Sequence, residues 1–419
     1  MHAHAVSVRV RLTIALAVIG LACIWLFAAS SPQADAKAKG KSHAKVKVTK
    51  GPKGLKFYKP PKKKKLPNQH GQLIWARGAT GLVPLQNARY TKLVLYSSRT
   101  PQGAKTAVSG SISVPRGKPP KGGWPVITWA HGTTGVADVC APSRNSVTSP
   151  AEPYISYIYP DLNAWLAAGY AVLQTDYQGL GTPGPHAYLV GVAEGRSVLD
   201  IVSAARQLDP NISKRYLIAG HSQGGQSALF AAGLAQSWEP KLKLRGTVAF
   251  APASHILDQA SLLPNLKSPS ALTALATLIV SGASTQSSAI NINAILSDQV
   301  LQFYPLLDSQ CLAQLGQSNE LGSVPPSNLE RSGADLSALN PVLGAMNPAV
   351  TSGAPILLAQ GTADTTVFPV YTDQLAVQLQ GLGDQLTYTK YPGVNHGGVV
   401  TAAEPQALSF FQQMLPPRG

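Results

Sequence analysis

The sequence lacks any cluster of histidines and cysteines at the spacing that binds metal ions, so we expect no metal site and no other cofactor. It has no internal repeat of the length of a propeller blade, which excludes a propeller. Acidic residues are few, 19 against 35 lysines and arginines among 419 residues, and there are only three cysteines. The chain is long enough for one large domain with an insertion.

The positive charge is concentrated near the N-terminus. Residues 37–65 hold 13 lysines and no acid, whereas residues 66–419 hold 20 basic and 18 acidic residues, so the formal charge of +16 belongs to a tail. Because a segment rich in Lys, Pro and Gly has too few apolar residues to bury a core, we predict a disordered linker over residues 37–68. Two interpretations of the 37–65 segment remain open, contact with an anionic cell surface and a solubilising spacer. Apart from Phe57 and Tyr58 it has no aromatic residues, so we expect no nucleic-acid partner.

The first 36 residues have the pattern of a targeting segment. Arg9 and Arg11 give a basic start, residues 12–29 form an apolar run of 18, and Ala34-Asp35-Ala36 offers small residues for cleavage. This pattern predicts a signal peptide over residues 1–36 and an exported protein, secreted or associated with the cell envelope. The run is also just long enough to remain in the bilayer, so membrane anchoring through residues 12–29 stays open.

The cysteine count agrees with export. Removal of Cys23 with the signal peptide leaves an even pair, Cys140 and Cys311. Since exported proteins favour disulfides, we predict a bond between Cys140 and Cys311. Two unpaired buried thiols are the alternative.

One stretch predicts a nucleophilic serine. The strand-like run Tyr216–Ala219 leads into Gly220-His221-Ser222-Gln223-Gly224, and a helix-forming run, Gln226–Ala232, follows. Strand, tight turn, serine and helix in this order place a serine hydroxyl at the tip of a strained turn. Glycines on both sides remove side chains that would clash there. We therefore predict Ser222 as the nucleophile.

A serine nucleophile needs a general base further along the chain. His396 lies in a loop, Pro392-Gly393-Val394-Asn395-His396-Gly397, directly after a strand-like run at 385–390. Loops over a rigid sheet carry functional groups, and this loop follows the last strand. The other histidine after Ser222, His255, lies earlier in the chain, so His396 is the predicted base.

The base needs a carboxylate to orient it. Asp364 follows a buried-looking strand that ends at Gly361, which places it at the carboxyl edge of the sheet. Asp373 falls inside an apparent helix, and Asp384 precedes the last strand and so lies at the wrong end. Asp364 is therefore the predicted acid.

Two backbone N–H groups are expected to stabilise an oxyanion. One belongs to Gln223, the residue after the nucleophile. The second comes from a loop after an early strand, and residues 125–130 form such a strand before His131-Gly132. Thr133 follows this pair, and its N–H is the second predicted donor.

The ordered set of motifs resembles a known family. The motifs are W-A-H-G-T-T-G at 129–135, D-V-C-A-P-S at 138–143, D-Y-Q-G-L-G-T-P-G-P-H at 176–186, G-H-S-Q-G-G at 220–225, G-T-A-D at 361–364 and N-H-G at 395–397. Over about residues 70–415 the chain resembles secreted lipases of the α/β-hydrolase superfamily, of the yeast lipase A type. The resemblance implies hydrolysis of lipophilic carboxylic esters such as acylglycerols, through a Ser-His-Asp triad and an acyl-enzyme. The fungal lipases carry glycine where this chain has Gln223, so their substrate preference is not carried over.

The pattern of apolar runs predicts an α/β fold that agrees with this resemblance. Residues 89–97 and 106–115 alternate like antiparallel edge strands. Near-continuous apolar runs near 126–130, 171–175, 215–219, 246–250, 355–360 and 385–391, with helices at 194–208, 223–236 and 368–382, indicate a mostly parallel central sheet covered by helices on both faces. Residues 254–345 interrupt the alternation, and we predict an inserted α-helical cap there within a catalytic domain spanning 69–419.

Three other functions remain open. The same residues are compatible with acyl transfer to an alcohol of the cell envelope, or with a serine peptidase. A third reading is a non-catalytic envelope protein that acts through its lysine tail. Asp176, at the end of a predicted strand, is expected to satisfy loop amides, with a direct role at the site as the alternative.

Overall fold

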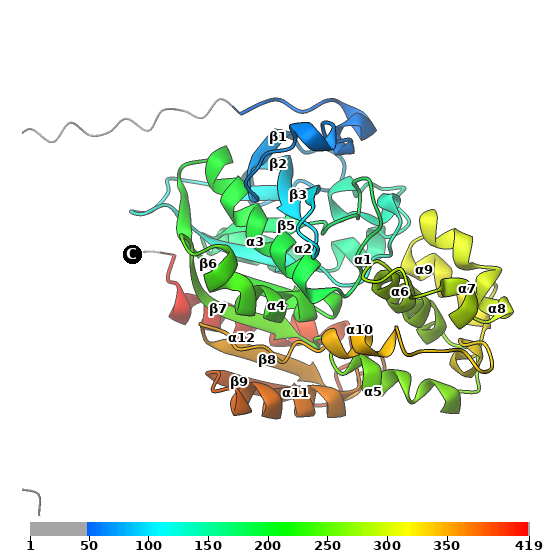
Figure 1. Cartoon of the computed structure of the whole chain (residues 1–419). Helices are drawn as coiled ribbons and strands as arrows, with labels where there is room; N and C mark the ends of the chain where they lie inside the picture. Colours follow the sequence, from blue (N-terminus) through cyan, green and yellow to red (C-terminus); the bar gives the residue numbers. More distant parts are fainter. Residues whose placement is uncertain (1–47, 418–419) are drawn as a thin grey trace, which may run out of the picture. The chain divides into compact units, whose positions relative to one another are not determined.

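The computed structural model describes residues 48–417, so the predicted signal peptide and the first part of the predicted linker lie outside the described residues. The described chain folds around a nine-stranded sheet in the order β1-β2-β3-β5-β4-β6-β7-β8-β9 (Figure 1). The strands are β1 Leu73–Gly78, β2 Ala88–Arg99, β3 Lys105–Pro115, β4 Trp124–Ala130, β5 Ala171–Thr175, β6 Ile212–His221, β7 Lys243–Phe250, β8 Ile356–Gly361 and β9 Leu386–Tyr391. Between residues 48 and 417, none of the helices combines the length and the apolar character needed to cross a membrane.

Strand direction divides the sheet into two parts. The β1–β2, β2–β3 and β3–β5 pairs are antiparallel, and all pairs from β5 through β4 to β9 are parallel. Every residue of β4, β5 and β8 is buried, as expected for strands covered on both faces. The prediction of a mostly parallel sheet with antiparallel edge strands is confirmed, and β1 was not among the predicted strands.

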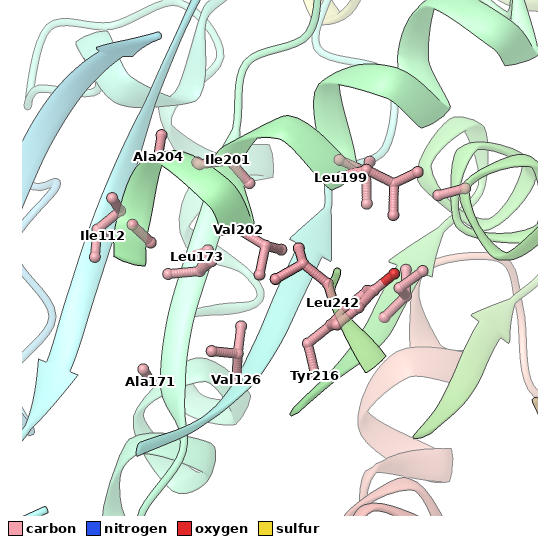
Figure 2. Packing of buried hydrophobic residues seen from close by; sticks show 14 of the residues in the cluster. Ile112, Val126, Ala171, Leu173, Leu199, Ile201, Val202, Ala204, Tyr216 and Leu242 are labelled. Carbon is pink, nitrogen blue, oxygen red and sulfur yellow. The ribbon is translucent and has the colours of Figure 1, made fainter. Parts of the chain in front are cut away.

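Helices cover both faces of the sheet. On one face lie α3 Gly191–Leu208, α4 Gln223–Trp238 and α11 Pro369–Gly381, and on the other lie α2 Tyr159–Ala167 and α12 Gly398–Met414. Figure 2 shows side chains of α3 packed on those of β3, β4, β5 and β6. Alternate residues of β8 point to opposite faces, since Ile356 and Leu358 pack under α11 while Leu357 and Ala359 join the cluster of α2 and α12.

Between β7 and β8 the chain forms short helices instead of sheet, in the region where the sequence predicts the cap. They are α5 Ile256–Ala260, η5 Leu263–Asn265, α6 Leu272–Ser284, α7 Ile292–Ile295, α8 Asp298–Leu301, η6 Tyr304–Asp308, α9 Leu312–Leu315, η7 Leu321–Ser323, η8 Pro326–Asn328 and α10 Asn340–Ala345. Their apolar residues form a cluster separate from the clusters around the sheet, and residues 187–190 join it. Before β5 lie η3 Asp138–Cys140, η4 Pro142–Arg144 and α1 Glu152–Ser156.

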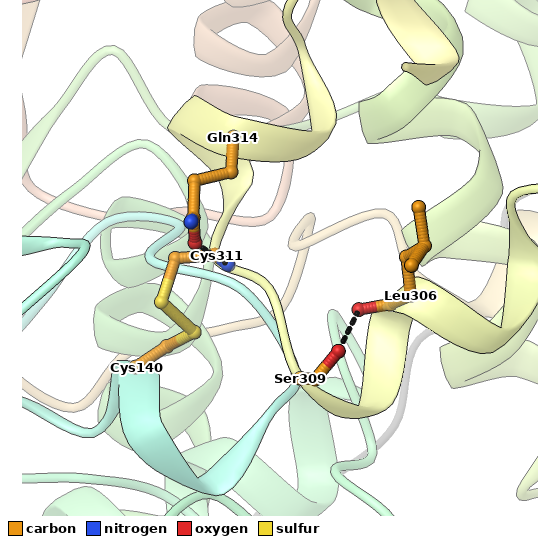
Figure 3. Close-up of a disulfide and its surroundings, with 5 residues drawn as sticks. All are labelled: Cys140, Leu306, Ser309, Cys311 and Gln314. Carbon is orange, nitrogen blue, oxygen red and sulfur yellow. Dashed lines mark hydrogen bonds between the residues drawn. A yellow bond between two sulfur atoms is a disulfide. The ribbon is translucent and has the colours of Figure 1, made fainter.

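A disulfide joins this cap to the loop that follows β4. Cys140 and Cys311 are bonded, with a Cα–Cα distance of 5.6 Å (Figure 3). The neighbouring backbone is joined as well, because Leu312 N–H donates to the carbonyl of Thr134 at 2.9 Å. The predicted disulfide is confirmed, and it fixes the start of α9 to the loop that carries Thr133.

The prediction of disorder is wrong for residues 48–68. This segment forms a bridge between Lys50 and Ala76 of β1 and two 3-10 helices, η1 Gly54–Tyr58 and η2 Lys63–Lys65. Phe57 and Tyr58 are 1% and 5% exposed, and the Tyr58 hydroxyl donates to the Ser143 carbonyl at 2.8 Å. The segment is too poor in apolar residues to build a core of its own, but its two aromatic side chains join an apolar cluster supplied by the sheet edge.

Candidate active site

Ser222 occupies a strained turn between β6 and α4. Its φ of 59° and ψ of −119° are rare for a residue with a side chain, and such strain persists only where the surroundings enforce it. A Cβ on Gly220 would lie 2.0 Å from the Gly224 carbonyl oxygen, and a Cβ on Gly224 would lie 1.9 Å from that of Ala130. Both glycines are therefore required by the close approach of the backbone around Ser222.

Asp364 and His396 lie together as the sequence predicts. His396 Nδ1 donates to Asp364 Oδ2 at 2.7 Å, and the other carboxylate oxygen accepts from the N–H groups of Thr366 and Val367 at 2.8 and 2.9 Å. Burial raises the pKa of Asp364, but the hydrogen bond and charge of His396 and the two amides outweigh it, so the pKa is lowered. An ionised Asp364 fixes the His396 tautomer that keeps a lone pair on Nε2.

The loops that carry these two residues are hydrogen-bonded to each other and to the serine turn. Ala363 N–H donates to the Val394 carbonyl at 3.0 Å. His221, next to Ser222, donates from Nε2 to the His396 carbonyl at 3.0 Å, and the two rings lie 4.6 Å apart. Within residues 48–417 no hydrogen bond joins Ser222 Oγ to the His396 ring, and such bonds often form only in the substrate complex.

The two predicted oxyanion donors flank Ser222. Gln223 is the first residue of α4, and Thr133 lines the same cavity as Ser222. Among the described residues, neither backbone N–H donates to another group, so both are available to a ligand. The Thr133 hydroxyl is hydrogen-bonded to the Tyr188 hydroxyl at 2.6 Å.

Ser222 opens onto a large apolar cavity between the sheet and the cap. The empty volume is about 950 Å³, including its open mouth. Most of its wall comes from the cap, and its aliphatic lining includes Ile256, Leu262, Leu263, Leu266, Leu272, Leu275, Ile279, Val280, Leu329, Leu339 and Leu343. Glu330 is the acidic residue of the lining, and desolvation raises its pKa.

The rival residues serve other contacts. His255 precedes α5 and its ring stacks on that of Tyr371 at 5.8 Å, and Asp373 accepts the Tyr388 hydroxyl at 2.7 Å. Asp384 accepts the N–H of Ser352 at 2.7 Å. None of the three is hydrogen-bonded to His396 or Ser222 among the described residues.

Asp176 satisfies loop groups, which agrees with the structural interpretation. It is fully buried and accepts the Ser109 hydroxyl at 2.6 Å and the Ser143 N–H at 2.8 Å. These contacts join the end of β5 to β3 and η4.

Residues 48–417 contain a single group of three side chains with the spacing of a metal site, His70, Asp200 and Glu239. His70 Nδ1 donates to Asp200 Oδ1 at 2.6 Å and lies 3.8 Å from Glu239 Oε1, while its ring stacks on Trp238 at 4.0 Å. Burial lowers the pKa of His70, but the two carboxylates outweigh it and raise the pKa. An ion pair accounts for these contacts. It lies near the C-terminal end of α4, a helix length of about 24 Å from Ser222.

Sequence reasoning missed the buried groups that surround the predicted site. His221 is held between the His396 carbonyl and the Tyr157 hydroxyl, which donates to its Nδ1 at 2.7 Å. Desolvation, with the neighbouring His396, lowers the pKa of His221 well below its ordinary value, so it is neutral. His186 and Glu194 contact the Gln223 side chain. The motif at 176–186 was the available signal for His186, whereas Glu194 lies on a predicted helix without a motif.

Comparison with known proteins agrees with the predicted resemblance. A family model described as secretory lipase matches residues 157–298. A curated lipase A of Moesziomyces aphidis is 26% identical over 184 residues, which are 42% of this chain and 38% of that protein. The chain thus spans well under half the length of this relative.

Solved structures extend the likeness to most of the chain. Candida antarctica lipase A in its closed state superposes with a TM-score of 0.72 at 19% identity, covering 85% of this chain and 84% of that one. The rice cell wall degrading esterase LipA from Xanthomonas oryzae gives 0.68 at 17% identity, covering 84% and 100%. At these identities the structures establish the fold alone. The predicted resemblance is confirmed: the chain has the α/β-hydrolase fold and is similar to secretory lipases.

Proposed function

We propose that this protein is an exported serine hydrolase that cleaves lipophilic carboxylic esters. The observation that carries the proposal is the strained Ser222 turn, which opens onto an aliphatic cavity beside the hydrogen-bonded Asp364–His396 pair. A carboxylate–histidine pair of this kind supplies a general base, and the turn presents the Ser222 hydroxyl to the cavity.

The reaction follows from these positions. His396 Nε2 takes the proton of Ser222 as its oxygen attacks the ester carbonyl, and Asp364 stabilises the imidazolium. The N–H groups of Thr133 and Gln223 donate to the oxyanion. His396 then protonates the leaving alcohol, and a water activated by His396 releases the acid from Ser222.

The cavity supports a lipophilic substrate. Its wall is mostly leucine, isoleucine and valine, and burial of each CH₂ group of a bound chain contributes about 0.8 kcal/mol. Longer acyl chains are therefore expected to react with higher kcat/KM until the cavity is filled.

Hydrolysis of p-nitrophenyl esters from acetate to palmitate, by the protein lacking residues 1–36 and by its Ser222→Ala variant, tests the proposal. Activity that rises with chain length and disappears in Ser222→Ala supports it. Activity on acetate alone would limit the substrates to short esters and contradict a lipophilic one. A folded protein without activity on any ester would refute ester hydrolysis and favour acyl transfer or a non-catalytic role.

We further propose that the lysine-rich segment contacts an anionic cell surface. Its described part is held in place by Phe57 and Tyr58 and exposes lysines at every third position, namely Lys50, Lys53, Lys56, Lys59, Lys62 and Lys65. The sequence contains no acidic residue between Asp35 and Asp138, so no acidic residue close to these lysines in the sequence neutralises their charge. Salt-dependent binding to vesicles of anionic lipid, lost when the six lysines become glutamine, would support this contact. Equal binding by both proteins would refute it.

A further inference from the structure

Glu194 is a fully buried carboxyl group that the proposed reaction does not use. It lies in the first turn of α3. Its oxygens accept from Leu189 N–H at 2.9 Å, from the Gln223 side-chain amide at 2.7 Å and from the Ser227 hydroxyl. Two of these donors, Gln223 and Ser227, belong to the first turns of α4.

The side chain of Gln223 is held by two partners. Besides Glu194 Oε1, its amide group donates to His186 Nε2 at 3.2 Å. His186 is itself oriented, because its Nδ1 donates to the Gln178 carbonyl at 2.8 Å and leaves Nε2 as an acceptor. The Gln223 amide oxygen has no partner among the described residues, so these two contacts are the hydrogen bonds that orient the side chain.

The same stretch of chain reaches the other side of the serine turn. Tyr188 lies between His186 and Glu194 in the sequence, and its hydroxyl is hydrogen-bonded to that of Thr133 at 2.6 Å. Residues 186–194 therefore contact both residues whose N–H groups are the proposed oxyanion donors. This stretch includes Leu189 in the left-handed region, at φ 57°.

We propose that Glu194 is a positioning residue for the oxyanion hole, acting through the side chain of Gln223 on the direction of the Gln223 N–H. The inference rests on the proposed function, since an oxyanion must form beside Ser222. Oxyanion donors accelerate a reaction only if they already point at the place where the charge develops. Gln223 follows a strained residue at the N-terminus of α4, where its own N–H has no backbone partner in the described part of the chain, and its side chain is anchored to a neighbouring helix through Glu194.

The alternative is a purely structural role, in which Glu194 joins α3 to α4 through Ser227. The two roles predict different effects of Glu194→Gln on kcat when the Gln223 side chain is present and when it is absent. A positioning role predicts that Glu194→Gln lowers kcat and leaves KM nearly unchanged, because the donor acts in the transition state. It also predicts that the effect disappears once the Gln223 side chain is absent.

The experiment is a double-mutant cycle with Glu194→Gln and Gln223→Leu, measured with the p-nitrophenyl ester that the wild-type protein hydrolyses best. Loss of one oxyanion donor costs about 10²- to 10³-fold in kcat, so a misdirected donor is expected to cost about 10- to 100-fold. We expect each single variant to show this loss and the double variant to be no slower than Gln223→Leu. Glu239→Gln, the same change near the other end of α4, is the matched control and should keep the wild-type kcat.

Transition-state affinity gives a second readout. An alkyl trifluoromethyl ketone forms a tetrahedral oxyanion with a serine nucleophile, and its inhibition constant in Glu194→Gln should rise by the same factor as kcat falls. Losses of kcat that multiply in the double variant, or an unchanged inhibition constant, would overturn the proposal. If Glu194→Gln does not fold, Gln223→Leu decides alone, since it keeps the N–H of residue 223 and a wild-type kcat would refute positioning.

Failure of this inference is distinguishable from failure of the proposed function. A wild-type protein that hydrolyses esters through Ser222, with Glu194→Gln equally active, would refute the role of Glu194 only. A wild-type protein without esterase activity would remove the premise of both.

Discussion

Replacing Cys140 and Cys311 together by serine measures what the disulfide contributes. The bond joins residues 171 positions apart in the sequence. In the chain-entropy treatment a closed loop of this size costs the unfolded chain about 17 cal/mol/K, or about 5 kcal/mol at 25 °C. Because measured disulfides more commonly contribute about 2–4 kcal/mol, we expect the double variant to lose about 2–5 kcal/mol of unfolding free energy.

The same substitution is expected to lower kcat as well as stability. A Cβ on Gly135 would lie 2.9 Å from the Cys140 sulfur, and Leu312 is hydrogen-bonded to Thr134. Without the bond, the loop that carries Thr133 loses its covalent tie to the cap. We expect kcat to fall by up to about tenfold, less than the 10²- to 10³-fold that follows loss of a whole oxyanion donor.

Urea unfolding followed by tryptophan fluorescence would compare three samples: oxidised wild type, wild type reduced with dithiothreitol, and the double variant. The reduced protein and the double variant should have the same unfolding midpoint. This midpoint should lie at a lower urea concentration than that of the oxidised protein. A double variant as stable as the oxidised wild type would refute the entropic reasoning. Lower stability with an unchanged kcat would refute only the link to the Thr133 loop.

Three further predictions concern single residues. Asp364→Asn should lower kcat for ester hydrolysis about 10⁴-fold, because the histidine loses its tautomer-fixing partner, and a fall below tenfold would assign the acid elsewhere. Phe57→Ala should cost about 3–5 kcal/mol of stability and expose the lysines of residues 48–68 to trypsin, and unchanged proteolysis would contradict anchoring by Phe57. Burial raises the pKa of Glu194 from 4.5 to about 7. The folded protein therefore keeps a proton that the unfolded chain loses between pH 4.5 and 7, so stability should fall as pH rises through this window, by on the order of 3 kcal/mol. The fall should be smaller in Glu194→Gln, as urea unfolding at several pH values would show.

The parallel strands were predictable because their apolar runs are local signals. The run predicted at 171–175 is β5, and the run at 355–360 is shifted by one residue from β8. The serine turn was predictable for a similar reason, since only glycine fits at positions 220 and 224. Asp364 and His396 were predictable as partners because their loops directly follow strands of the sheet.

The ordered state of residues 48–68 was not predictable from composition. Lysine, proline and glycine dominate this segment, and a composition rule weighs them against only two aromatic residues. The rule assumes that a segment must bury its own apolar surface. Here Phe57, Tyr58 and Leu66 complete a cluster whose other members, including Val83 and Leu95, belong to the domain. Order in this segment therefore depends on tertiary contacts that have no local pattern.

The contacts of Gln223 in the site were not predictable from the sequence either, because they too are tertiary. Chemistry at this position requires only a backbone N–H, and the resemblance leads one to expect glycine. A buried amide must be hydrogen-bonded, and at 1% exposure Gln223 depends on Glu194 and His186 for its partners. Glu194 depends in turn on Gln223 and Ser227, because an unpaired buried polar group costs about 1–3 kcal/mol. The stability costs of Glu194→Gln and Gln223→Leu should therefore sum to more than the cost of the double variant, by about 1 kcal/mol or more. Additive stability costs in urea unfolding would mean that the two side chains are in contact but that their interaction does not contribute to stability.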